Sequence, residues 1–240
     1  MKIALFDLDE TLVRAECRNY ALEVICQDIS KKTKIPVKIL SNSLIQIWHQ
    51  EKDPRKKYDW DQHIKKLCSE VKVEFIYNYE TSIKKNINKA KLFPDVLPLL
   101  KYLKKNKYKI CIITNGLKKY QYPIMKKLGL LKYISKVYSP HQGFLKPDPR
   151  IFNNELKNKQ VSFYADDQLY QGVFLARKIH TKSILIDRKF KAKNLNSYLR
   201  NKLSNELKER RFDVSLKHLT PDYIVNDLRK IIKILENESK

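Results

Sequence analysis

Short apolar runs that end in polar residues alternate along this chain with apolar positions at helical spacing. The runs occupy residues 2–6, 109–113, 161–165 and 183–187, and residues 223–225 fit a last edge strand. Runs of this length and composition are typical of strands buried on both faces. Between them lie helical patterns, one of which consists of Val96, Leu99, Leu100 and Leu103. The alternation predicts an α/β fold, a doubly wound parallel sheet covered by helices.

Residues 14–91 follow a different pattern, because they lack buried-strand runs and carry apolar stripes at helical spacing. Two of these stripes are Ile39, Leu40, Leu44, Ile47 and Trp48, and Trp60, Ile64, Leu67 and Cys68. We therefore expect residues 14–91 to form a small all-helical cap inserted after the first strand. The sheet core would then comprise residues 1–13 and 92–240.

Residues 188–220 form a second insertion, between the last two predicted strands. Ten basic residues against three acidic ones give it a charge of +7 over 33 residues. Its leucines recur every four residues, at Leu195, Leu199, Leu203 and Leu207. Part of the segment is therefore predicted to be an amphipathic helix. Two interpretations stay open: a solvated helix packed on the edge of the core, or a basic rim that binds a polyanion or a protein partner.

The chain as a whole is strongly basic. It has 50 lysine and arginine residues against 26 acidic ones, a formal net charge of +24 over 240 residues. Such a charge attracts nucleic acids non-specifically. However, 40 of the 50 basic residues are lysine, whereas arginine is the side chain that reads bases through paired hydrogen bonds. Nucleic acid is therefore an alternative partner rather than the favoured one.

The composition does not indicate a membrane or secreted protein. Hydrophobic residues make up 42% of the chain, enough for a buried core, but no apolar run reaches the length of a membrane span. The apolar stretch at Ile3–Phe6 is too short for a signal peptide. The four cysteines form no CxxC pair and no histidines stand at zinc spacing. A reducing, cytoplasmic compartment is therefore expected, rather than a disulfide framework or a structural zinc site.

Polar residues at the strand ends carry the candidate chemistry, because parallel sheets bind ligands at the carboxyl ends of their strands. Asp7 and Asp9 follow the first strand with one residue between them. Two carboxylates this close are not both cheaply ionised unless a cation or different roles separate them. One such division is a nucleophile that forms an aspartyl-phosphate and an acid/base that protonates the leaving oxygen and later deprotonates water.

Three further elements suit a phosphate group and a metal ion. The TNG motif at 114–116 offers a hydroxyl and backbone amides after the second predicted strand, and Lys146 offers a positive charge. Asp166 and Asp167 end another strand and supply the hard oxygen ligands that Mg²⁺ prefers. Asp7 with Asp166, helped by Asp167, would hold Mg²⁺ and reduce the repulsion between an anionic nucleophile and an anionic substrate.

These elements, in this order, resemble the haloacid dehalogenase-like hydrolase superfamily. DLDET at 7–11 matches the first motif, Thr114 after an apolar strand the second, Lys146 the third, and the acidic pair at 166–167 the fourth. The segments LFPDVLPLLKYLKKNKYKICIITNG, KKLGLLKYISKVYSP and KPDPRIF also resemble the family's shared sequence. The resemblance covers residues 1–13 and about 92–187, and PDYIVNDLRKIIKIL at 221–235 resembles the usual final strand and helix.

The resemblance implies a Rossmann-like core with a helical cap and gives each motif a role. It implies that Asp7 is the nucleophile and Asp9 the general acid/base. The implied phosphate-binding residues are Thr114, Asn115 and Lys146. The implied Mg²⁺ ligands are Asp7, the backbone carbonyl of Asp9, Asp166 and Asp167. Dehalogenases of the family lack the second aspartate of the first motif, because a halide leaves without a proton. Asp9 therefore favours phosphoryl chemistry.

The chain also departs from the family pattern around the fourth motif. Ala165 stands where glycine is usual, and Tyr170 and Gln171 stand where a second acid is frequent, so that Asp167 would have to serve as that acid. Cap residues that are candidates for substrate contact are Arg14, Arg18, Trp48, Tyr58 and Trp60.

We therefore predict a Mg²⁺-dependent phosphatase, a phosphoric monoester hydrolase acting on a small phosphorylated metabolite. A sugar or triose phosphate or a phosphoglycolate-like compound is the expected substrate class. The alternatives are a phosphatase or binding protein that acts on nucleic-acid ends, a phosphomutase, and a regulatory protein on an inactive enzyme scaffold.

Overall fold

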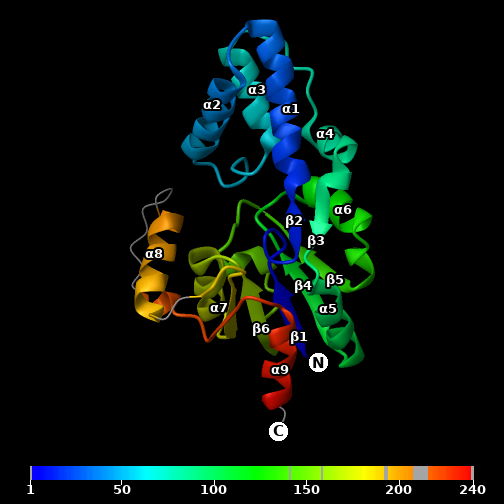
Figure 1. Ribbon diagram of the computed structural model, residues 1–240, viewed down its shortest axis with the longest axis vertical. Coiled ribbons are helices and arrows are strands. Elements are labelled where there is room, and N and C mark those ends of the chain that lie inside the picture. Colours follow the sequence, from blue (N-terminus) through cyan, green and yellow to red (C-terminus); the bar gives the residue numbers. More distant parts are fainter. Residues whose placement is uncertain (1, 141, 158, 192–193, 208–215, 239–240) are drawn as a thin grey trace.

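The computed structural model describes residues 2–140, 142–157, 159–191, 194–207 and 216–238. Over these ranges the chain builds a six-stranded sheet in the order β5-β4-β1-β6-β7-β8 (Figure 1). The strands are β1 (Ile3–Phe6), β4 (Lys109–Ile113), β5 (Ile134–Tyr138), β6 (Val161–Asp166), β7 (Lys182–Ile186) and β8 (Tyr223–Val225). Every neighbouring pair is parallel, so the carboxyl ends of the strands meet at one edge.

The predicted parallel α/β sheet is confirmed, and it contains one strand that the sequence pattern did not indicate. In β5, Ser135 and Lys136 are exposed and Tyr138 is fully buried. A strand at the edge of a sheet buries fewer side chains than a central one, so β5 lacks the apolar run that marks β1 and β4. At the opposite edge, β8 is the predicted last strand.

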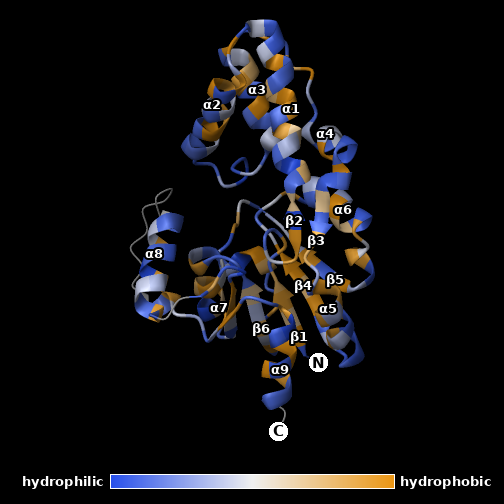
Figure 2. Ribbon diagram, in the orientation of Figure 1, coloured by the Kyte–Doolittle hydropathy of each residue, from blue (hydrophilic) through white to orange (hydrophobic). Residues whose placement is uncertain are grey.

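Each face of the sheet has its own apolar core. Side chains alternate along β1, so that Ala4 and Phe6 join one buried cluster and Ile3 and Leu5 join the other. The first cluster includes residues of α5 (Val96–Lys105) and α9 (Arg229–Asn237), and the second includes residues of α7 (Phe174–Lys178). Figure 2 shows apolar residues gathered in the sheet, whereas the helices around it carry both apolar and polar residues.

The other helices of the core region are short or lie beside the strand ends. They are α6 (Lys118–Lys127), α8 (Leu195–Leu207), η2 (Leu130–Lys132), η3 (Pro149–Phe152), the π-helical turn η4 (Leu169–Val173) and η5 (Leu216–Leu219). The chain leaves α6 through Gly129, whose φ of +66° is a left-handed conformation that favours glycine.

Residues 14–91 stand beyond the carboxyl edge of the sheet and are mainly helical (Figure 1). The helices described there are α1 (Glu16–Thr33), α2 (Val37–Gln50), α3 (Trp60–Glu70), α4 (Tyr79–Lys85) and η1 (Ile87–Lys89). Most of the two predicted stripes is buried, including Leu40 and Leu44 on α2 and Ile64 on α3. Trp48 and Trp60 are half-buried, and Ile39 is 54% exposed.

A two-stranded antiparallel ribbon joins this helical segment to the core. It pairs β2 (Val13–Ala15) with β3 (Ala90–Leu92). The expectation of an all-helical segment is therefore modified at both of its ends. The sequence did not indicate the ribbon, because three-residue strands are too short to show an alternating pattern.

The amphipathic helix predicted within residues 188–220 is α8. Leu199 and Leu203 are buried in a third apolar cluster, whereas Leu195 is 43% exposed. The helix lies beside the core at the side of α7 (Figure 1). Of the ten basic residues counted in this insertion, Lys193, Lys208, Arg210 and Arg211 lie outside the described residues.

Two further expectations from composition can be compared with the fold. None of the helices in the described ranges is long and apolar enough to cross a membrane. Each of the four cysteines, all of which the structure describes, is buried and outside any disulfide.

Candidate active site

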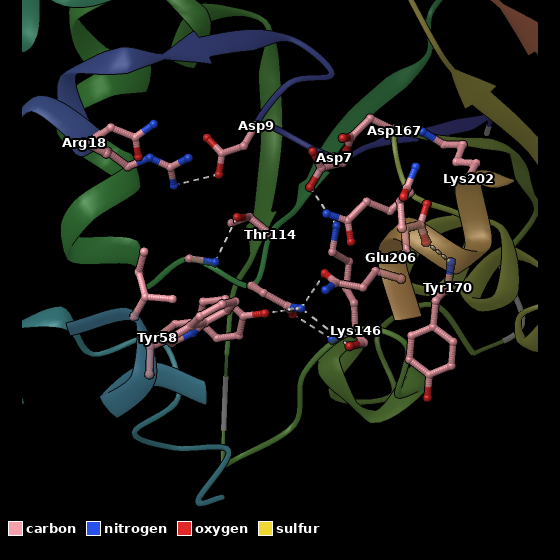
Figure 3. A pocket seen from close by; sticks show the side chains of 18 of the residues that line it. Asp7, Asp9, Arg18, Tyr58, Thr114, Lys146, Asp167, Tyr170, Lys202 and Glu206 are labelled. Carbon is pink, nitrogen blue, oxygen red and sulfur yellow. Dashed lines mark hydrogen bonds and ion pairs between the residues drawn. The ribbon is translucent and has the colours of Figure 1, made fainter. Parts of the chain in front are cut away.

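Three neighbouring strands bring the predicted site residues to one edge of the sheet. Asp7 follows β1, Thr114 follows β4, and Asp166 is the last residue of β6. Because β4 and β6 flank β1, the carboxyl ends of these three strands lie side by side. Residues far apart in the sequence thereby meet in one pocket (Figure 3).

Lys146 is the centre of a buried ionic cluster in this pocket. Its Nζ donates hydrogen bonds to Asp7 Oδ1 at 2.7 Å and to Asp166 Oδ2 at 2.8 Å. The Lys146 side chain is 2% exposed, and Asp166 Oδ2 also accepts the hydroxyl of Tyr164. A buried ammonium needs such partners, because removing an unpaired charge from water is costly. The structure therefore brings together the residues that stand for the first, third and fourth motifs.

Burial and neighbouring charges set the protonation of this cluster. Burial raises the pKa of Asp7 to about 7, the negative charges of Asp166 and Asp9 act in the same direction, and Lys146 opposes them. Burial would lower the pKa of Lys146, but Asp166 and Asp7 outweigh it and hold that pKa well above its ordinary value. Lys146 therefore stays cationic at neutral pH beside a carboxyl group that titrates there. Shifts of this kind are typical of functional sites.

Asp9 lies in the same pocket and has different partners. Its Oδ2 accepts hydrogen bonds from Gln121 Nε2 at 2.7 Å and forms an ion pair with Arg18 Nη1 at 2.8 Å. Gln121 belongs to α6, beside the sheet, and Arg18 belongs to α1 of the helical segment. The sheet region and the helical segment therefore each contribute a side chain that binds this carboxylate. Asp9 Oδ1 is buried and has no hydrogen-bond partner among the described residues. This oxygen is therefore available to a ligand.

Thr114 offers a hydroxyl hydrogen to a ligand. Its Oγ1 accepts hydrogen bonds from the backbone N–H of Gly116 at 3.0 Å and from Gln121 Nε2 at 3.2 Å. Since a hydroxyl both accepts and donates, the donor remains available. Gly116 also makes room for Gln121, because a Cβ on this glycine would lie 2.2 Å from Gln121 Nε2.

Asn115 uses both ends of its amide within the protein. Its Oδ1 accepts the backbone N–H of Lys146 at 2.7 Å, and its Nδ2 donates to Gln171 Oε1 at 2.8 Å. These contacts fix the loop that carries Lys146. Asn115 also lines the pocket, and its assignment to the substrate phosphate stays a prediction.

A group of three carboxylates forms the candidate metal site. Asp7, Asp166 and Asp167 each offer an oxygen, and these oxygens lie within 4.8 Å of one another. Asp7 Oδ2 is buried without a hydrogen-bond partner in the described part of the chain. Burial, together with the charges of Asp166 and Asp7, also raises the pKa of Asp167 well above its ordinary value. A donor set of crowded, partly unsatisfied carboxylates fits a hard divalent cation such as Mg²⁺.

The side chain of Asp9 is not part of this group of carboxylates. It is held by Arg18 and Gln121 instead. The expectation that Asp9 binds a metal concerned its backbone carbonyl, and it stays a prediction.

Gly172 lets the π-helical turn η4 pack directly on Asp166. A Cβ at position 172 would lie 2.2 Å from Asp166 Cβ and 2.4 Å from its Cγ. Any other residue would force the helix or the aspartate to move. In addition, the backbone N–H of Gln168 donates to Asp166 Oδ1 at 2.9 Å. The segment that follows the acidic pair therefore fixes the orientation of Asp166.

The pocket encloses about 1190 Å³ between the strand edge, the helical segment and α8. Four of the five cap residues that we expected to reach a substrate line it: Arg18, Trp48, Tyr58 and Trp60. The fifth, Arg14, lies with its guanidinium 5.2 Å from the centre of the Phe93 ring.

Several residues of the site were not identified from the sequence. Gln121 and Gln171 bind Asp9 and Asn115, and Tyr164 binds Asp166. Gln121 could have been noticed as a polar residue beside the apolar face of a predicted helix, since it is fully buried. Tyr164 lies two residues before Asp166 and therefore on the same face of β6, whereas Gln171 carries no local signal, because Asn115 is 56 positions away.

Solved structures share this fold over almost the whole chain. A HAD phosphatase from Thermococcus onnurineus is 24% identical, with 98% of each chain covered and a TM-score of 0.72. A 2-haloacid dehalogenase from Pseudomonas syringae pv. Tomato is 20% identical, with 99% of each chain covered and a TM-score of 0.66. A predicted phosphoglycolate phosphatase from Haemophilus somnus is 18% identical, with 98% of each chain covered and a TM-score of 0.59. At these identities the similarity establishes the fold.

No curated protein sequence matches this chain at a significant level. The family model for a haloacid dehalogenase-like hydrolase matches residues 1–165, which include Asp7, Thr114 and Lys146. Together with the parallel sheet and the residues at its edge, this match shows that the chain belongs to the haloacid dehalogenase-like hydrolases.

Proposed function

We propose that this hydrolase is a Mg²⁺-dependent phosphatase that acts on a small phosphomonoester, such as a sugar or triose phosphate or a phosphoglycolate-like compound. The observation that carries the proposal is the contact of Lys146 with both Asp7 and Asp166, beside an Asp9 that has one oxygen without a partner among the described residues. The four free cysteines support a cytoplasmic location for this activity.

The reaction would proceed in two displacements at phosphorus. In the first, an Asp7 carboxylate oxygen forms a bond to phosphorus as the bond to the leaving alcohol oxygen breaks. Asp9, protonated on Oδ1, donates that proton to the leaving oxygen. In the second, Asp9 accepts a proton from water, the water oxygen attacks phosphorus, and the Asp7 carboxylate leaves as inorganic phosphate is released.

The neighbouring groups support each part of this scheme. Lys146 would balance the charge of the phosphoryl oxygens, and the Thr114 hydroxyl would donate a hydrogen bond to one of them. Asp7, Asp166 and Asp167 would hold Mg²⁺. When bound, the ion supplies positive charge against which two anions, the substrate and Asp7, can approach each other.

Asp9 also argues against dehalogenation as the reaction. Displacement of a halide from carbon requires no proton for the leaving group, whereas an alkoxide leaving phosphorus does. In this chain Arg18 and Gln121 hold Asp9 through Oδ2 alone, which leaves Oδ1 for the proton.

The proposal can be tested with p-nitrophenyl phosphate and a panel of phosphorylated metabolites, assayed with Mg²⁺ and after chelation. We expect turnover that requires the metal and that Asp7→Asn reduces by at least about 1000-fold. A single-turnover reaction quenched in acid should yield a phosphorylated peptide that contains Asp7.

A matched control is Asp148→Asn, because Asp148 pairs with Arg150 outside the pocket lining. This variant should retain full activity. Absence of turnover over the whole panel of substrates and metals would contradict the proposal. Turnover of 2-haloacids in place of phosphate esters would reassign the chemistry, and a preference for phosphorylated oligonucleotide ends would point to a nucleic-acid substrate.

A further inference from the structure

Helix α8, from the insertion that no family motif covers, presents two different faces. Its apolar face packs on the core through Leu199 and Leu203, in a cluster with Leu169, Val173, Leu185 and Leu219. Its other face lines the same pocket as Asp7 and Lys146 through Ser197, Asn201 and Asn205, and Asn194, just before the helix, lines it as well. These side chains are uncharged amides and a hydroxyl. They are the groups that donate to and accept from substrate hydroxyls.

Two polar contacts fix α8 against the candidate metal site. Glu206 Oε1 accepts the backbone N–H of Leu169 at 2.8 Å, and Glu206 Oε2 accepts that of Tyr170 at 3.0 Å. Leu169 and Tyr170 begin η4, two and three residues after Asp167. These bonds satisfy N–H groups at the start of the helix that packs on Asp166. These bonds therefore fix the position of α8 relative to the residues at the strand edge.

Lys202 is a cation on this helix whose one ion pair among the described residues is long. It lines the pocket, and its side chain is 21% exposed. Its ion pair with Asp187 Oδ2 is 3.9 Å long, and that oxygen already accepts the hydroxyl of Tyr198. Both oxygens of Glu206 are occupied by backbone donors. Within the described part of the chain no residue accepts a hydrogen bond from Lys202 Nζ, although the charge of Lys202 acts on nearby Asp167 and Glu206 (Figure 3).

We propose that Lys202 on α8 binds a second anionic group of the substrate, a carboxylate or a phosphate carried by the alcohol that leaves, while the amides of α8 bind the hydroxyls of that alcohol. This inference rests on the proposed phosphatase function and names its substrate class. The physical reason is that an ammonium with unused hydrogen-bond donors in the pocket can bind an anionic group of a ligand through charge-assisted hydrogen bonds. Among the pocket-lining residues described on α8, Lys202 is the one positive charge.

Two matched substrate pairs distinguish the sources of the second anion. The first pair is 3-phosphoglycerate and glycerol 3-phosphate, which differ by a carboxylate. The second is fructose 1,6-bisphosphate and fructose 1-phosphate, which differ by a phosphate. We expect the wild-type protein to have a higher kcat/KM for the doubly anionic member of at least one pair. Lys202→Gln should lower that value about 10-fold or more, mainly through KM, and Lys202→Arg should keep most of it.

Two controls separate this inference from the proposed function and from loss of the fold. Hydrolysis of p-nitrophenyl phosphate should change less than about twofold in Lys202→Gln, since this ester has no second anion. Arg200→Gln should leave every ratio unchanged, because Arg200 is exposed on α8 and lies outside the pocket lining. Thermal denaturation of each variant monitors the fold.

The possible results have different meanings. If the wild-type protein hydrolysed no phosphate ester, the proposed phosphatase function itself would be contradicted. Aryl phosphate turnover without a preference for either doubly anionic substrate would overturn the role of Lys202. An equal loss on all substrates in Lys202→Gln, with no recovery in Lys202→Arg, would overturn it as well.

Discussion

Charged residues at the strand edge differ in burial and pairing from charged residues on α1 and α8, the helices that form the walls of the pocket. At the edge, Lys146 is 2% exposed and sits between Asp7 and Asp166. On the helices that line the pocket, Arg18 and Lys202 are 26% and 21% exposed at the side chain, and each forms an ion pair with a single carboxylate, that of Asp9 or Asp187. The edge is a compact ionic cluster whose members depend on one another, whereas a wall residue can change with less effect on its surroundings.

This difference has an energetic cause. Charges that are fully buried are tolerated only when they are paired, so that removal of one partner leaves an uncompensated charge in the interior. Charges that keep contact with solvent are screened, and their pairing contributes little to stability. We therefore expect substitutions at the edge to affect every substrate and the fold, and substitutions in the walls to affect the choice of substrate.

The largest expected effect is that of Lys146→Met. It removes the ammonium between two buried carboxylates and should lower the free energy of unfolding by about 3–5 kcal/mol, with loss of activity on all phosphate esters. Chemical denaturation measures the stability. Added Mg²⁺ should restore part of it, because a cation at the carboxylates replaces the lost charge.

Lys119→Met is the matched control for this comparison. Lys119 forms ion pairs with Asp59 and Asp61 at 3.1 and 3.0 Å, but its side chain is 40% exposed. Its replacement should change the free energy of unfolding by no more than about 1 kcal/mol. Equal destabilisation by the two variants would contradict the expectation that buried ion pairs contribute more to stability than solvent-exposed ones.

The next effect is that of Asp9→Asn, which should depend on the leaving group. Loss of the proton donor should reduce kcat/KM for alkyl phosphates by about 100- to 10,000-fold. Aryl phosphates with acidic phenols should lose much less, since their leaving oxygen needs no proton. A steeper dependence of rate on leaving-group pKa is the measurement, and a uniform loss across all leaving groups would exclude Asp9 as the acid.

The smallest of these effects is that of Gly172→Ala. Its Cβ would lie 2.2 Å from Asp166 Cβ, so η4 must shift, at a cost of about 1–3 kcal/mol. We expect the Mg²⁺ concentration for half-maximal activity to rise, measured by metal titration, as Asp166 moves. Gly129→Ala is the control away from the site, since it strains a left-handed turn without meeting another atom within 4 Å. If both variants required the same Mg²⁺ concentration, Gly172 would have no specific role.

Local patterns were sufficient for most of the fold. The apolar runs identified β1, β4, β6, β7 and β8, and the polar residues that follow them are the ones at the sheet edge. Such features depend on residues adjacent in the chain, since a buried strand needs apolar side chains on both faces. The edge strand β5 and the ribbon of β2 and β3 lacked that signal because they are short or half exposed.

The partners of the site residues depended on the tertiary structure. Gln121 binds Asp9 across 112 positions of the sequence, and Glu206 binds Leu169 across 37. Asn115 accepts the backbone N–H of Lys146 across 31 positions. No local pattern encodes such pairs, because they form only after strands and helices have packed.

By itself, the sequence determined that the chain forms a parallel α/β sheet with Asp7, Thr114 and Asp166 at the ends of strands. Only the tertiary structure decided that β4 and β6 flank β1, that Arg18 reaches Asp9, and that α8 forms a wall of the pocket. The physical reason is that hydrophobic periodicity is a property of neighbouring residues, whereas the meeting of distant side chains depends on strand order and helix packing.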